Sequence, residues 1–536
     1  MTLLVPFVLV AYVVLYAFAL SIPPLALLPH FLSGAGKLQT QRPLLDSLDA
    51  WIEREETIAL ERLLDNVAPG GKNTQGNGVV DGTVLASPST SMPDYFFQWV
   101  RDAAITTQTL VDLYKADPSS ERASQLATIL DAYAQLQAGI QHTNNPSGSF
   151  SDLAGLGEPK FEVDGSPFTG SWGRPQRDGP ALRAITLMSY LRAYNASHPA
   201  LWDTEKGEDW FKPFYQAEMP ANSIIKADLE YVSHVWTQGG FDLWEEVQGL
   251  HFFTAMVQLK ALREGADLAH AFDDLGAAAW YSEQAAYLED FLQMFWDEEK
   301  GHLIETMDSP RSGLDCGILL GSLHALPSET SNLDPVFPPW SDEILVTLLA
   351  LANDQRSRFP INSKPIVVDE DEDLDQDEGE NVQARTPFSG TGIGRYPEDI
   401  YTGTGTAPGG GNPWFLCTSS AAEILYRTAS HISTSARLTI TPRSHPFYAA
   451  LLADSSLELE SEAEYGPSDA IFQSIVDRLR IAGDEFLDVV KTHVDGEGRM
   501  SEQFDGVTGY MRGARDLTWS YGAFLKAVWA RGEEKD

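Results

Sequence analysis

The sequence predicts an all-α fold, in which helical hairpins form a toroid with a binding site at one end. Helical periodicity returns along the whole chain, whereas alternating strand patterns are few. Long loops rich in glycine, proline and aromatic residues separate the helical segments at 70–99, 143–178 and 387–414. Loops of such length are usually functional or disordered. Because these loops carry tryptophan, arginine and aspartate, we expect them to build the site.

The helical segments begin after Ser47, a residue type that caps helix N-termini. Leu48, Trp51, Ile52 and Ile58 then recur at helical spacing. The later segments with the same periodicity are 103–114, 119–141, 179–195, 221–236, 246–263, 268–296, 310–325, 341–357, 417–431, 467–482 and 514–531.

Composition limits the partners that the protein can have. The chain has 37 Lys and Arg residues against 77 Asp and Glu residues, for a net charge of −40. This balance opposes binding to nucleic acid or to anionic membrane surfaces. It suits a neutral partner, or work in an acidic medium. The 13 Trp and 18 Tyr residues fit stacking on sugar rings, although most aromatic residues simply pack in cores.

The N-terminal region has a composition of its own. Residues Leu3–Leu28 are almost wholly apolar, and no Lys or Arg precedes Lys37. We interpret 1–28 as a signal peptide or an uncleaved signal anchor, and 29–46 as a linker or pro-segment. The folded domain then spans 47–532.

Two stretches of that domain have the composition of insertions. The segment 366–384 is strongly acidic, which predicts a disordered, solvated loop. Thr402–Gly411 is rich in glycine and threonine, which predicts flexibility.

The chain has two cysteines, Cys316 and Cys417, so at most one disulfide can form. We expect two buried free thiols. Asn195 heads an Asn-Ala-Ser sequon, which predicts N-glycosylation and agrees with passage through the secretory pathway.

Two carboxyl groups are the candidates for acid–base chemistry. Glu245 and Glu246 follow Trp244, and adjacent like charges beside an indole favour a protonated carboxyl that can donate its proton. The alternative is a solvated Glu-Glu pair in the first turn of a helix, where acids suit the helix dipole. A second carboxyl, Glu502, lies far along the chain.

Three clusters elsewhere in the chain have the composition of a sugar site. Aromatic faces bind the apolar face of a pyranose, while Arg and Asp bond its hydroxyl groups. The residues are Tyr95, Trp99, Arg101 and Asp102 in the first loop, Trp172 in the second, and Arg395, Tyr401 and Trp414 in the third. The alternative for each cluster alone is an ordinary ion pair among core aromatics. Phosphate-loop and zinc-helix motifs are missing from the sequence.

Several long motifs together resemble the glucoamylase family of glycoside hydrolases. The chain contains, in the order of that family, PDYFFQWVRD, TGSWGRPQRDGPALRA, FDLWEEV, GRYPED, NPWFLC, SEQFDG and ARDLTWSYGA. The resemblance spans about Ser47 to Arg531. It implies an (α/α)6 barrel, with twelve helices in two concentric rings. It also implies an exo-acting, inverting hydrolase that releases β-D-glucose from non-reducing ends of starch and malto-oligosaccharides. The α-1,4 links would be cut faster than α-1,6 links, with neither metal nor organic cofactor.

The resemblance also implies roles for single residues. Glu245 is similar to the family's general acid and Glu502 to its general base. Such a pair stands about 6.5–9.5 Å apart in inverting enzymes. The residues implied in substrate binding are Tyr95, Trp99, Arg101, Asp102, Trp172, Leu243, Trp244, Glu246, Arg395, Tyr401 and Trp414.

Departures from the family pattern carry expectations too. Phe504 replaces a Tyr, which predicts the loss of a hydroxyl near the base. The disulfides of secreted relatives cannot form, which leaves a vacuolar or membrane-anchored location open beside a secreted one. We expect a monomer without a starch-binding domain. The alternatives for function are hydrolysis of another α-glucoside and a non-catalytic carbohydrate-binding toroid.

Overall fold

The computed structural model describes residues 47–202, 204–327, 333–363 and 388–533. All of them lie in one compact unit that spans Leu44–Asp536. The predicted N-terminal segments and the acidic insertion at 366–384 fall outside the described residues. Among the helices described, none combines the length and the apolar content that a membrane crossing needs.

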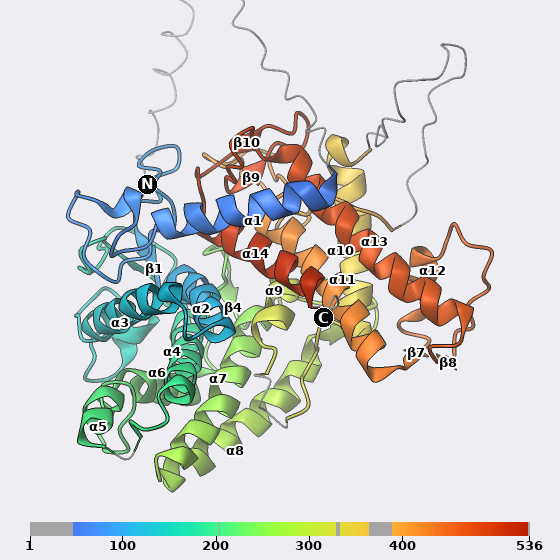
Figure 1. The fold of residues 1–536 in the computed structure, drawn as a ribbon. Helices are drawn as coiled ribbons and strands as arrows, with labels where there is room; N and C mark the ends of the chain where they lie inside the picture. Colours follow the sequence, from blue (N-terminus) through green and yellow to red (C-terminus); the bar gives the residue numbers. More distant parts are fainter. Residues whose placement is uncertain (1–46, 203, 328–332, 364–387, 534–536) are drawn as a thin grey trace, which may run out of the picture. The chain divides into compact units, whose positions relative to one another are not determined.

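Six helices form a closed inner ring (Figure 1). Each packs against the next in the order α2, α4, α7, α9, α11, α14, and α14 returns to α2. Their bounds are Val100–Ala116, Asp178–Ser197, Phe252–Ala271, Cys316–His324, Phe415–Ser435 and Thr518–Gly532. Most side chains of α4 and α14 are buried, because neighbours cover these helices on several sides.

Six further helices form an outer ring, and each packs on one inner helix. These are α1 Leu48–Asp65 on α14, α3 Glu121–Gln141 on α2, α6 Ile224–Val235 on α4, α8 Leu275–Leu292 on α7, α10 Asp342–Arg358 on α9 and α13 Ala470–His493 on α11. Outer and inner helices alternate along the chain. The predicted double ring of six helical hairpins is therefore confirmed.

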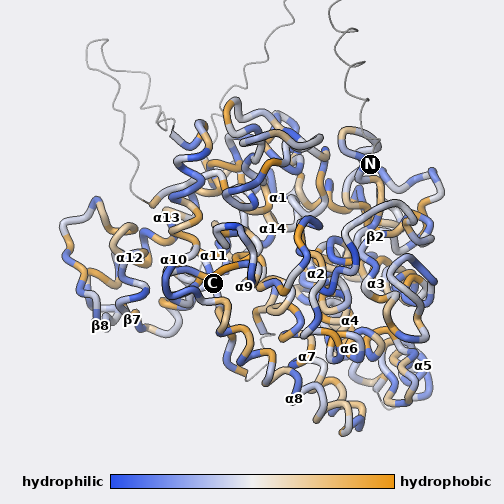
Figure 2. Tube along the Cα trace, turned by 180° about the vertical axis from the view of Figure 1, so that it is seen from behind, coloured by the Kyte–Doolittle hydropathy of each residue, from blue (hydrophilic) through white to orange (hydrophobic). Residues whose placement is uncertain are grey.

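Apolar and hydrophilic positions mix along the helical segments, which is the pattern that predicted them (Figure 2). Ser47 caps α1 as predicted, because its hydroxyl accepts a hydrogen bond from the Ala50 amide. The predicted helix 246–263 is wrong at its start. Residues 248–249 form a strand, and α7 begins at Phe252 and runs to Ala271. The short helices α5 Glu205–Phe211 and α12 His445–Leu451 were not predicted.

Short strands occur only in pairs among the described residues. The pairs are β1 Gln98–Trp99 with β2 Lys160–Phe161, β3 Gly240–Phe241 with β4 Gln248–Gly249, β5 Trp296–Asp297 with β6 His302–Leu303, β7 Leu438–Ile440 with β8 Ala463–Tyr465, and β9 Gln503–Phe504 with β10 Met511–Arg512. All five pairs are antiparallel. Four of them, β1–β2, β3–β4, β5–β6 and β9–β10, lie in the loops that precede inner helices.

The first and last helices of the described residues, α1 and α14, pack against each other (Figure 1). Trp51 packs edge-on against Phe524, with ring centroids 5.4 Å apart. The Asn66 amide donates to the hydroxyl of Thr518, the first residue of α14, at 2.9 Å. These contacts join residues more than 400 positions apart and hold α1 against the last inner helix, which in turn packs on α2.

The expectation of two free thiols is wrong. Cys316 and Cys417 form a disulfide, with Cα atoms 5.8 Å apart and 101 positions between them in sequence. Both residues are fully buried at the N-terminal ends of α9 and α11. Apolar surroundings at each cysteine indicated burial correctly, but only the ring packing brings the two sulfur atoms together.

We expect replacement of both cysteines by alanine to lower the free energy of unfolding by about 2–4 kcal/mol, because the bond closes a long loop in the unfolded chain. Thermal unfolding monitored by circular dichroism measures the change. The wild-type protein heated with a reductant that reaches the bond should unfold at the variant's temperature. Equal stability of oxidised wild type and double variant would contradict the assignment.

Candidate active site

The long loops that lead into the inner helices enclose a pocket with about 640 Å³ of empty space, partly open to solvent. Its lining includes both candidate acids and most residues of the predicted sugar site. The lining residues are Ala86, Tyr95, Trp99, Arg101, Asp102, Leu243, Trp244, Glu245, Glu246, Arg395, Tyr401, Trp414, Glu502, Leu517 and Trp519.

Glu245 lies in the tight turn between β3 and β4, not in a helix. The Asp242 carboxylate accepts hydrogen bonds from the amides of Glu246 at 2.7 Å and Val247 at 2.9 Å. The Glu245 backbone adopts a left-handed conformation, with φ of +68°. Non-glycine residues rarely adopt this conformation, and when they do it is often at functional sites. The interpretation of Glu245 and Glu246 as a solvated pair in a helical first turn is therefore wrong.

The carboxyl of Glu245 is held through one of its two oxygens. Oε1 accepts hydrogen bonds from the Trp99 indole at 2.7 Å and from the Gln176 amide at 2.9 Å. The Arg101 guanidinium lies 3.8 Å from the same oxygen. In the described part of the chain, no hydrogen bond reaches Oε2. Because both donors bond Oε1, Oε2 is the oxygen that is free to carry a proton.

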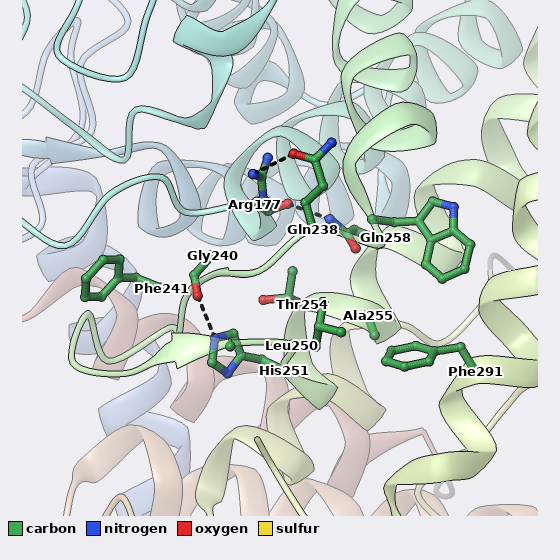
Figure 3. A pocket seen from close by; sticks show the side chains of 12 residues that line it. Arg177, Gln238, Gly240, Phe241, Leu250, His251, Thr254, Ala255, Gln258 and Phe291 are labelled. Carbon is green, nitrogen blue, oxygen red and sulfur yellow. Dashed lines mark hydrogen bonds between the residues drawn. The ribbon is translucent and has the colours of Figure 1, made fainter. Parts of the chain in front are cut away.

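A smaller cavity lies behind the turn that carries Glu245 (Figure 3). There the His251 ring contacts the Gly240 carbonyl through Nε2 at 3.0 Å and the Thr306 hydroxyl through Nδ1 at 2.9 Å. Burial lowers the pKa of His251, which favours a neutral ring that donates from Nε2. His251 thereby ties strand β3 to the start of α7.

Glu502 is fully buried between the ends of two loops. Its Oε1 accepts a hydrogen bond from the Tyr95 hydroxyl at 3.0 Å, and its Oε2 accepts from Tyr401 at 3.3 Å and from the Ala514 amide at 3.4 Å. Donors on both oxygens favour the carboxylate form. Tyr95 packs on Trp99 with ring centroids 5.4 Å apart, so contacts run from Glu502 through these two rings to Glu245.

Burial raises the pKa of Glu502 to about 7. The Tyr95 hydrogen bond, the positive charge of Arg395, the Ala514 amide and the Tyr401 hydroxyl act in the opposite direction. A carboxyl with this pKa exchanges its proton near neutral pH, which is the property of an effective acid–base group.

Arg395 and Glu246 form a charged network in the pocket wall. The Arg395 guanidinium donates to Glu246 at 2.8 Å and holds Asp399 through two bonds at 2.9 and 2.7 Å. Arg311 and Tyr396 donate to the other Glu246 oxygen. Burial would raise the pKa of Glu246, but Arg395, Tyr396 and Arg311 together hold it below its usual range. Glu246 is therefore an anion beside Glu245.

Arg101 and Asp102 occupy the first turn of α2, which begins at Val100, three residues before the predicted start of this helix. Arg101 is almost fully buried and contacts Gln176 at 2.8 Å and Asp178 at 3.1 Å. Burial raises the pKa of Asp102 to about 6, although the neighbouring Arg101 opposes this. One Asp102 oxygen accepts no hydrogen bond from the described residues, although the Arg101 Nε atom lies 3.3 Å from it.

Twelve of the thirteen predicted catalytic and binding residues line the pocket. Trp172 does not; it packs behind Trp99, with ring centroids 5.9 Å apart. Phe504 does not line it either, because its ring stacks on His493 at 4.3 Å in the core. The hydroxyls near Glu502 come from Tyr95 and Tyr401 instead.

Asn195, the predicted glycosylation site, lies half-buried in the last turn of α4. Its glycosylation stays a prediction.

The sequence reasoning missed several members of the site. Gln176 donates a hydrogen bond to Glu245, but it was not singled out within the motif TGSWGRPQRDGPALRA that contains it. Trp519 lines the pocket from α14. Arg311, Tyr396 and Asp399 complete the network at Glu246. The Thr402–Gly411 segment, predicted to be flexible, is closed by main-chain bonds, among them Gly411 to Asp399 at 3.0 Å. Its Gly403 carbonyl accepts from Tyr401, so the segment supports the wall at Glu502.

A double ring of helices, with two carboxyls and aromatic walls at one end, defines a helical glycoside hydrolase. The family model described as "Glycosyl hydrolases family 15" matches residues 57–529, and the chain belongs to that family.

Curated relatives agree with this membership. A glucoamylase of Saccharomycopsis fibuligera is 38% identical over 91% of each chain, and a probable glucoamylase of Schizosaccharomyces pombe is 34% identical over 90% of this chain and 92% of its own. The solved glucoamylase of Saccharomycopsis fibuligera superposes with a TM-score of 0.79 at 35% identity, over 93% of this chain and 98% of its own. The glucoamylase of Hypocrea jecorina superposes with 0.77 at 34% identity, over 91% and 72%.

Gly513 packs directly on the Glu502 carboxyl. Its backbone has φ of +73°, and a Cβ atom there would come within 2.0 Å of Glu502 Oε2. We expect Gly513→Ala to displace that carboxyl and to lower the rate of glycoside hydrolysis by about 100-fold, because small misplacements at a reacting centre are costly. Gly276→Ala in α8 is the matched control, since a Cβ there meets nothing within 4 Å. Activity of Gly513→Ala equal to that of the control would argue against this packing role.

Proposed function

We propose that the protein is an exo-acting, inverting α-glucan hydrolase that releases β-D-glucose from non-reducing ends of starch, dextrins and malto-oligosaccharides. Membership of the family and the pairing of Glu245 with Glu502 across one pocket carry this proposal. The α-1,4 bond is its main target and the α-1,6 bond a slower one.

Glu245 acts as the general acid. Its Oε2–H bond breaks, the proton moves to the glycosidic oxygen, and the bond from that oxygen to the anomeric carbon breaks with the electron pair staying on oxygen. The donors Trp99 and Gln176 on Oε1 leave Oε2 as the proton-bearing oxygen. The Glu246 anion beside Glu245 disfavours early loss of that proton.

Glu502 acts as the general base. It takes a proton from a water molecule as that water attacks the anomeric carbon from the face opposite the leaving group. Hydrogen-bond donors on both of its oxygens support the ionised form that a base requires. A chain of contacts joins the two carboxyls: Tyr95 bonds Glu502, Trp99 bonds Glu245, and the two rings pack together. Family membership supports the inverting stereochemistry of this proposal.

The remaining pocket residues bind the terminal glucose. Tyr95, Trp244 and Trp414 offer aromatic faces, and Trp244 and Trp414 pack together with ring centroids 5.4 Å apart. Asp102 and Arg101 bond hydroxyl groups from the α2 side, while Arg395 and Glu246 bond the sugar near the cleaved link. Most of these polar groups are already held by neighbours, so little order is lost when substrate binds.

The protein is inferred to pass through the secretory pathway. The buried disulfide supports this inference, because such bonds form and persist in oxidising compartments. Resistance of both cysteines to alkylation in protein isolated from its own cells, before any exposure to oxidant, checks the inference. Rapid alkylation of unfolded, unreduced protein would contradict it.

We expect Glu245→Gln and Glu502→Gln each to lower kcat by about 10²–10⁴-fold while the fold persists, because each variant loses a positioned proton donor or acceptor. Glu264→Gln is the control, since this buried acid of α7 pairs with Arg192 and does not line the pocket. Polarimetry or NMR of the first product from maltotriose tests the stereochemistry: β-glucose supports inversion, and α-glucose refutes it.

Tyr95→Phe should shift the acid limb of the kcat/KM profile to higher pH. The Tyr95 hydrogen bond lowers the pKa of Glu502, so its loss raises that pKa, and the base is then ionised only at higher pH. Tyr133→Phe is the control, because Tyr133 is a buried tyrosine of α3 whose hydroxyl has no hydrogen-bond partner among the described residues. An acid limb that stays in place in Tyr95→Phe would count against Glu502 as the base.

A further inference from the structure

A lysine side chain is enclosed by four aromatic rings beside the pocket. The Lys160 ammonium lies 3.7 Å from the ring centroid of Trp172, 3.9 Å from Phe97, 4.3 Å from Phe168 and 4.5 Å from Trp99. We call these four residues the Lys160 cage. All four distances are within the range of a cation–π contact, which is about 6 Å.

Lys160 is buried, with 2% of its surface exposed. No hydrogen bond or ion pair reaches its ammonium among the residues that the structure describes. An ammonium has three N–H donors, and a buried one without a paired carboxylate is unusual. The aromatic faces of the cage are therefore its main stabilising contacts.

The cage is continuous with the proton donor. Lys160 and Trp99 are register partners in the β1–β2 pair, so the backbone fixes their relative position. The Trp99 indole then donates to Glu245 Oε1 at 2.7 Å. Trp172 packs between Trp99 and Phe168, with ring centroids 5.9 and 5.6 Å apart. The Lys160 ammonium thus contacts both Trp99, which lines the pocket beside Glu245, and Trp172, which packs behind Trp99.

The charged groups around Lys160 also connect it with Glu245. Burial lowers the pKa of Lys160 to about 8, so the side chain is a cation at neutral and acidic pH. The carboxylates that act on it are Glu245, Asp94 and Glu162, and Arg174 opposes them. Around Glu245 itself the charged neighbours are Arg101, Asp102 and Glu246. Of the carboxylates acting on Lys160, Glu245 has the largest effect.

We propose that Lys160 is a positioning residue for the proton donor: its ammonium fixes Trp99 and Trp172 and stabilises the carboxylate that Glu245 becomes after protonating the glycosidic oxygen. This inference rests on the proposed function. The Glu245 proton ends on the leaving oxygen, and the charge left on Glu245 is the one that Lys160 attracts. Substrate itself does not touch Lys160, which lies behind the rings.

Lys160→Met is the decisive variant. A methionine has a similar length, and its sulfur makes favourable contacts with aromatic rings, so the cage stays filled while the charge is lost. We expect kcat on maltose to fall about tenfold with a smaller change in KM. The alkaline limb of the kcat profile should move up by about half a pH unit, because an acid without the nearby cation keeps its proton to higher pH.

Two further variants separate this role from a purely structural one. Lys160→Arg restores the cation and should return the alkaline limb towards its wild-type position. Lys226→Met removes another buried lysine, which pairs with Asp274 and Glu230 away from the pocket, and should leave the profile unchanged. A Lys160→Met enzyme with the wild-type kcat and the wild-type alkaline limb would overturn the proposal.

The indole N–H signal of Trp99, assigned by its loss in Trp99→Phe, gives a readout that needs no turnover. Lys160→Met should shift or broaden this NMR signal, and an unchanged signal would overturn the positioning role. Absence of glucose release by the wild-type protein would refute the proposed function, and the NMR comparison would still decide the inference.

Discussion

Closure of the inner helix ring is the constraint on which the site depends. Residues of the first loop, such as Tyr95, and residues of the last loop, such as Glu502, are about four hundred positions apart, yet they share a hydrogen bond. They meet because α14 packs against both α1 and α2, with Trp51 on Phe524 and Asn66 on Thr518. The free energy of that packing comes from apolar burial along the helices, far from any catalytic group.

The alternation of outer and inner helices then determines where the chemistry occurs. An outer helix precedes each inner helix along the chain, so all six inner helices begin at the same end of the ring. The loops that enter them carry Trp99, Glu245, Arg395, Trp414 and Glu502. Helix N-termini also bring partial positive charge to that end, which favours carboxylates there. In a chain of net charge −40, this bias and the buried Arg101 and Arg395 offset repulsion among the pocket acids.

The two carboxyls differ in their environments, and this difference separates their roles. Glu245 receives donors on one oxygen and stands beside the Glu246 anion, which suits an acid that holds a proton until it is needed. Glu502 receives donors on both oxygens within a fully buried site. Enzymes commonly separate acid from base by such contrasts of environment. The left-handed backbone at Glu245 is held by Asp242, so the turn is specified by its own sequence.

Sequence periodicity predicted the twelve helices of the two rings, because an amphipathic or fully apolar repeat is a local property. It missed α5 and α12, which have seven residues each and are too short to show a repeat. It also placed the start of α7 too early, because the apolar pattern does not reveal that Gln248 and Gly249 pair with β3. Motif residues such as Tyr95 and Trp414 were found from their chemistry.

The amino-acid sequence by itself determined the class of the protein, its helical segments and the residue types of its site, since each depends on local spacing or on a recognisable motif. Only the tertiary structure decided that Cys316 meets Cys417, that Phe504 turns into the core and that Lys160 lies among four rings. Those relations join segments that are distant or differently oriented, and no local pattern encodes the direction of a side chain. They follow from how the closed ring of helices orients its loops.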